Sequence, residues 1–75
     1  MKSQRAKAFR ELFAALPKRA QHQANEAYKL FKQDPFHPSL HFKPLDPAEP
    51  SVYSARVGMH YRVIGIREGD SILWV

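Results

Sequence analysis

Histidine is the first residue type in this chain that suggests chemistry, because imidazole binds metals and transfers protons near neutral pH. The chain has four histidines, and only His37 and His41 stand four residues apart. Pro38 lies between them and disfavours the helix that would place two imidazoles of this spacing on one face. The chain contains no cysteine, which excludes thiol nucleophiles, disulfides and iron–sulfur clusters. We therefore predict neither a metal site nor a cofactor.

Basic residues are the second group that suggests chemistry. Twelve Lys and Arg against seven Asp and Glu give a formal charge of +5 on 75 residues. So large an excess on a small surface favours polyanions, which include nucleic acid, the ribosome and acidic proteins. Arginine suits phosphate best, because its planar guanidinium presents a fork of donors that matches phosphate oxygens. We expect association with nucleic acid.

The first half of the chain has the periodicity of helices. Apolar residues from Phe9 to Leu16 follow the i, i+3, i+4, i+7 spacing of one helical face, which predicts a helix over about 4–16 with Ser3 as its N-cap. Pro17 interrupts that helix and suits the first turn of the next one. We predict the second helix over about 17–33. Two amphipathic helices with so short a connection are expected to form an antiparallel hairpin.

The second half is rich in proline and then alternates apolar and polar residues, which is typical of strands. The short turns between these segments predict antiparallel pairing. The expected fold class is α+β, a single domain of residues 1–75 in which the helical hairpin packs on a small antiparallel sheet of three or four strands. The last segment is apolar to its end, and an uncovered apolar edge is unusual, so we expect a truncated chain or a covering partner. The strands are predicted at about 40–43, 52–57, 60–67 and 71–75.

Five segments, in this order, resemble the RelE/ParE superfamily, the toxins of bacterial toxin–antitoxin pairs. The resemblance implies a helical hairpin packed on an antiparallel sheet, as the periodicity also predicts. Members open with a short strand, which only residues 2–6 could supply here, and their sequence is poor for a strand. Members also continue with a helical segment that often carries a catalytic His, Tyr or Lys, which this chain lacks. The similar segments are Phe9–Pro17, Gln23–Phe31, Asp34–Lys43, Tyr53–Val57 and Tyr61–Val63.

The resemblance to RelE implies a cytoplasmic endoribonuclease, an mRNA interferase that cuts mRNA on the ribosome. The RNA 2′-hydroxyl attacks the adjacent phosphate, so the protein supplies a base, cations and an acid but no metal. An antitoxin, acidic or partly disordered, is the implied partner. An antitoxin or self-association would add the burial that so small a core lacks. No apolar run is long enough to span a membrane.

The resemblance also implies which residues act. Arg62 matches the arginine that holds the scissile phosphate, Arg56 is the second candidate, and Lys43 matches a basic position of the first strand. These three are the expected catalytic residues. Alternation along the strand puts Arg56 on one side with Ser54, and whether Arg62 shares that side is left open. The expected RNA-binding residues are His41, His60 and Tyr61.

Two other functions remain open, because function depends on the site and not on the fold. The chain could be a ParE-like inhibitor that binds DNA gyrase without an active site. It could also be a truncated, non-catalytic module that still binds an antitoxin. The pair Arg56 and Arg62 favours the nuclease.

Overall fold

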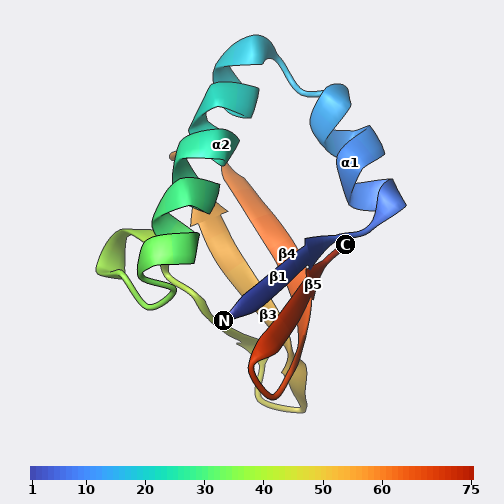
Figure 1. Ribbon diagram of the computed structural model, residues 1–75, viewed down its shortest axis with the longest axis vertical. Helices are drawn as coiled ribbons and strands as arrows, with labels where there is room; N and C mark the ends of the chain where they lie inside the picture. Colours follow the sequence, from blue (N-terminus) through green and yellow to red (C-terminus); the bar gives the residue numbers. More distant parts are fainter.

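A computed structural model describes all residues from Met1 to Val75. The chain folds into five strands, two α-helices and one short 3-10 helix (Figure 1). None of the helices has the length and hydropathy needed to cross a lipid bilayer. In chain order the elements are β1 (Lys2–Arg5), α1 (Lys7–Ala14), α2 (Lys18–Gln33), η1 (Pro38–Leu40), β2 (Lys43–Asp46), β3 (Glu49–Val57), β4 (Tyr61–Glu68) and β5 (Ser71–Trp74).

The five strands form one mixed sheet in the order β1-β5-β4-β3-β2. The prediction of an antiparallel sheet of three or four strands is therefore wrong, because β1 joins it and runs parallel to β5. This strand covers the edge of β5, whose Ile72 and Trp74 are buried and apolar. The backbone N–H of Ala6 donates to the carbonyl of Trp74 at 2.8 Å. The apolar last strand is thus internal to the sheet.

The start of the chain also differs from the prediction, because residues 2–5 pair with β5 as a strand. Ser3 is not a helix cap but lies in β1, where its Oγ accepts a hydrogen bond from the indole Nε1 of Trp74 at 3.0 Å. Residues that are poor strand formers are held extended by the backbone pairing with β5. The first helix consequently begins at Lys7 instead of about residue 4.

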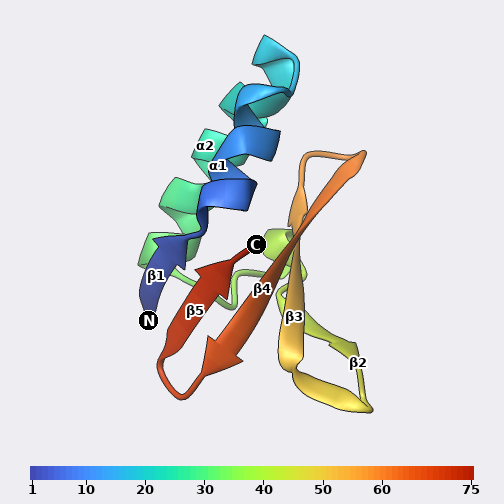
Figure 2. The same cartoon turned by 90° about the vertical axis from the view of Figure 1, so that its right-hand side faces the viewer.

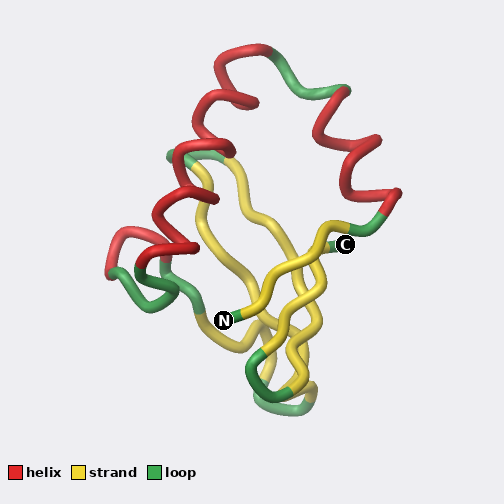
Figure 3. The backbone as a smooth tube through the Cα atoms, viewed as in Figure 1, coloured by secondary structure: helices red, strands yellow, loops and turns green.

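The two helices do not form the expected close hairpin. They meet at the turn of residues 15–17 and diverge from it (Figures 1 and 3). Gln21 holds the turn, because its Nε2 donates to the carbonyl of Leu16 at 3.0 Å and to that of Ala14 at 3.3 Å. The other end of α1 follows directly on β1, which is paired with β5. Helix α1 buries none of its residues, whereas α2 buries Ala20 and Phe31.

The strand predicted at 40–43 is also displaced. Residues Pro38–Leu40 form a 3-10 turn, which is stabilised by the backbone N–H of Ser39 donating to Nδ1 of His37 at 3.2 Å. His41 then adopts a left-handed conformation with φ 47°, and β2 begins only at Lys43. The other three predicted strands correspond to β3, β4 and β5, of which β3 begins three residues before its predicted start.

Helix α2 packs across one face of the sheet, and the opposite face, here called the outer face, carries no helix (Figure 2). Aromatic side chains dominate the core between them. The ring of Phe31 lies 5.1 Å from that of Phe42 and 5.3 Å from that of Trp74, both edge-on. Only 10 of 75 residues are buried, so stability depends on few side chains. The main core cluster consists of Phe31, Leu40, Phe42, Ala55, Ile72 and Trp74.

Candidate functional site

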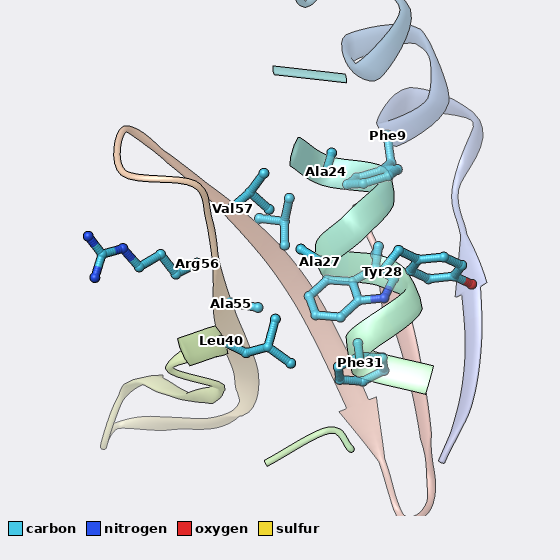
Figure 4. Close-up of a pocket in the computed structure, with 11 residues that line it drawn as sticks. Phe9, Ala24, Ala27, Tyr28, Phe31, Leu40, Ala55, Arg56 and Val57 are labelled. Carbon is cyan, nitrogen blue, oxygen red and sulfur yellow. The ribbon is translucent and has the colours of Figure 1, made fainter. Parts of the chain in front are cut away.

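Arg56 and Arg62 lie directly opposite each other in the pairing of β3 with β4. Residues paired in this way have their side chains on the same face of the sheet. The neighbours of Arg56 in β3, Ala55 and Val57, are buried against α2, so both arginines belong to the outer face. Figure 4 shows the side chain of Arg56 pointing away from Ala55 and Val57. The register therefore answers the question that strand alternation left open.

Lys43 lies on the same outer face. It pairs with Ser54 of β3, which stands two residues before Arg56. Residues two positions apart in a strand have their side chains on the same face, so Arg56 and Ser54 share a face with Lys43. Lys43 is therefore the diagonal neighbour of Arg56. The structure thus brings together all three predicted catalytic residues, which we call the cation patch: Lys43, Arg56 and Arg62.

No acidic side chain neutralises the cation patch. The ion pairs of the structure join the Met1 amino group to Asp70, Lys7 to Glu11, and Lys29 to Glu26, and none involves the patch. Like charges directly opposite each other in a sheet are unfavourable. A bound anion between Arg56 and Arg62 would relieve this repulsion.

The side chain of Arg56 is positioned by a hydrogen bond to the backbone just after the end of β3. Its Nε donates to the carbonyl oxygen of Gly58 at 3.0 Å, which leaves both terminal nitrogens of the guanidinium without a protein acceptor. Gly58 has φ +60°, and a Cβ at this position would lie 2.5 Å from Oε1 of Gln23. A glycine is therefore needed where the hairpin meets α2, and it fixes the carbonyl that positions Arg56.

Ser54 occupies the middle of the outer face with its hydroxyl unsatisfied. The residue is 0% exposed, and its Oγ has no hydrogen-bond partner. A buried polar group without a partner costs about 1–3 kcal/mol. Ser54 is register partner of both Lys43 and Ile64, so this orphan hydroxyl lies within the cation patch.

His41 is connected to the cation patch through a groove of about 780 Å³, which we call the polar groove. The groove runs between α2 and residues 39–41, and Arg56 lines it as well. The sequence-based prediction missed the α2 wall, although residues 22, 26, 29 and 33 repeat at the spacing of one helical face. The polar groove presents His22, Glu26, Lys29, Gln33, His41 and Arg56.

His60 and Tyr61 lie elsewhere. His60 is exposed in the turn between β3 and β4. Tyr61 follows the alternation of β4 to the face opposite Arg62 and lines an apolar pocket of about 250 Å³ with Leu12 of α1 and Leu16 of the following turn. The structure therefore places Lys43, Arg56 and Arg62 on one face and His41 in a groove that Arg56 also lines, whereas His60 lies in a turn and Tyr61 follows the opposite face.

The pocket drawn in Figure 4 belongs to the core. Its volume is about 40 Å³, and Phe9, Tyr28 and Trp74 are among the apolar residues that surround it. A space of this size between apolar side chains is a packing gap and accommodates no substrate. No group of three potential metal ligands occurs in the structure.

Comparison of the sequence with models of known protein families gives no match, and comparison with curated proteins gives no significant match. The cation patch and the polar groove are therefore the features from which a function can be argued.

Proposed function

We propose that this chain is a RelE-like toxin, a metal-independent endoribonuclease that cuts mRNA on the ribosome in the bacterial cytoplasm. The single observation that supports the proposal is the direct opposition of Arg56 and Arg62 on the outer face, without an acidic partner. Two guanidinium groups on one face of neighbouring strands can each donate to the non-bridging oxygens of one phosphodiester.

In the proposed reaction, the 2′-oxygen of one ribose attacks the adjacent phosphorus and the 5′-oxygen of the next nucleotide leaves. Arg56 and Arg62 hold the phosphate oxygens and stabilise the negative charge that develops on them. Lys43, the diagonal neighbour of Arg56, donates a proton to the leaving 5′-oxygen. His41, which lines the polar groove with Arg56, supplies an imidazole that accepts the 2′-hydroxyl proton.

An acidic antitoxin is the proposed partner. Helix α1 buries none of its residues, and Leu12 is 66% exposed beside the apolar pocket that Tyr61 and Val75 also line. Exposed apolar surface of this kind marks contact sites for other proteins. Lys7 and Arg10 of α1 are exposed next to it and favour an acidic partner chain.

The test is an mRNA cleavage assay in a translating bacterial extract, with Arg62→Ala as the site variant and Arg19→Ala as the control. Arg19 is exposed on α2 and lies outside the patch and the groove. The wild type and Arg19→Ala should cut mRNA, whereas Arg62→Ala should lose about 10²- to 10³-fold of the rate, as expected for a removed phosphate-stabilising donor.

Two outcomes would reject the nuclease. Cleavage unaffected by Arg62→Ala would remove the cation patch from the reaction. Intact mRNA together with halted gyrase supercoiling would point to a ParE-like inhibitor instead.

A further inference from the structure

The polar groove exists because β2 begins only at Lys43 and covers only the first part of β3. The last pair between β2 and β3 is Lys43 with Ser54, so β3 continues to Val57 without a strand on that side. His41, in a left-handed conformation, joins η1 to the segment that leads into β2. Side chains of α2 face the opening from the other side, and Arg56 stands where the groove meets the outer face.

Charge within the groove is nearly balanced away from Arg56. Glu26, its one carboxylate, lies 3.4 Å from Nζ of Lys29, measured from Oε1. A phosphate placed beside that carboxylate would be repelled. A neutral group that carries both donors and acceptors would instead be favoured, since Gln33, Glu26 and His41 offer amide, carboxylate and imidazole groups.

The apolar parts of the groove suit a flat ring. Leu30 and Leu40 contribute apolar surface to its lining, and Met59 borders it with its side chain 77% exposed. Methionine is flexible and polarizable, so it packs well against aromatic rings. Imidazoles such as that of His41 also stack on nucleobases in RNA-binding proteins.

We infer that the polar groove is a nucleobase subsite, which receives an unpaired base of single-stranded RNA next to the phosphate held by Arg56 and Arg62. This role rests on the proposed function and extends it from phosphate contact to base recognition. Arg56 lines the polar groove and also belongs to the cation patch, so one continuous RNA chain can occupy the groove and the phosphate site. In a duplex the hydrogen-bonding edges of the base are already paired, and the base cannot enter.

The test compares two probes by fluorescence anisotropy: a single-stranded RNA pentamer, 2′-O-methylated so that it is not cut, and the same backbone without bases. The variant is Gln33→Ala with Met59→Ala, which changes two groove residues outside the proposed catalytic set. The Kd of the variant for the pentamer should rise about tenfold, which is within the range expected for one lost base contact. Its Kd for the abasic probe should not change. Asn25→Ala removes an exposed amide from another face of α2 and should leave both Kd values unchanged.

The outcomes separate the subsite from the proposed function. If Arg62→Ala weakens both probes while the groove variant weakens neither, the base subsite is wrong and the phosphate site stands. If the groove variant weakens both probes equally, or a duplex binds as tightly as the single strand, the groove does not recognise a base. If neither probe binds the wild-type protein, the proposed function fails as well. Thermal melts followed by circular dichroism establish that each variant is folded.

Discussion

Gly65 lies directly opposite Trp74 in the pairing of β4 with β5, and the indole occupies the space that a side chain at Gly65 would need. A Cβ at this position would be 2.8 Å from Cε3 of Trp74 and 2.8 Å from Cδ1 of Ile72. Both neighbours are buried, so neither can move away without disturbing the core.

Replacement of Gly65 by alanine should therefore destabilise the protein by about 1–3 kcal/mol through overpacking. Urea unfolding followed by Trp74 fluorescence measures the change. Gly69→Asn is the matched control, because a Cβ at Gly69 meets nothing within 4 Å and asparagine tolerates its φ of +56°. Equal stability of Gly65→Ala and wild type would contradict the packing described for β4 and β5.

The hydrogen bond between Ser3 and Trp74 gives a second prediction. Ser3→Ala removes the acceptor of a buried indole N–H and should lower the free energy of unfolding by about 1–3 kcal/mol. Gln4→Ala, one residue further along β1 and exposed, should change it little. Comparable losses for the two variants would argue against the contact of β1 with Trp74.

The opposition of two positive side chains, Arg56 and Arg62, leads to a third prediction. Arg62→Ala should weaken RNA binding yet leave the free energy of unfolding unchanged or raise it by up to about 0.5 kcal/mol at low salt, because the repulsion from Arg56 is lost. The gain should shrink at high salt, where exposed charges are screened. Thermal melts at two salt concentrations measure the effect. A clear loss of stability would mean that Arg62 is structurally required.

Ser54 allows the fourth prediction. Ser54→Ala removes a buried hydroxyl that has no partner and should raise the free energy of unfolding by about 1 kcal/mol. Because this hydroxyl is fully covered, affinity for the abasic RNA probe should stay unchanged. Ser51→Ala, at an exposed position of β3, serves as control for both measurements. A destabilised Ser54→Ala protein would show that the hydroxyl has a partner after all.

Local patterns were sufficient for α2 and for β3 to β5, because helical periodicity, strand alternation and turn residues are local properties. They failed at β1, whose extended form depends on pairing with β5 at the opposite end of the sequence. Turn chemistry around Pro38 and His41 displaced the first predicted strand.

The same division applies to the site. Alternation placed Arg56 beside Ser54 on one side of a strand, but the opposition to Arg62 depends on the register of the hairpin. A slip of one residue in that register would have put the two guanidinium groups on opposite faces. The polar groove depends on packing between α2 and residues 39–41, which the sequence does not reveal. Only the helical spacing of residues 22, 26, 29 and 33 indicates that they share one face of α2.

The parallel pair of β1 and β5 also determines when the molecule can acquire its core. Ser3 and Trp74, which this pair brings into contact, are separated by 71 positions. Contacts between such remote residues form late and slowly in folding, because a long loop must close before they gain any energy. During synthesis Trp74 leaves the ribosome after β3 and β4, so the hairpin that carries both arginines can pair before the nascent chain has an indole to pack beneath it.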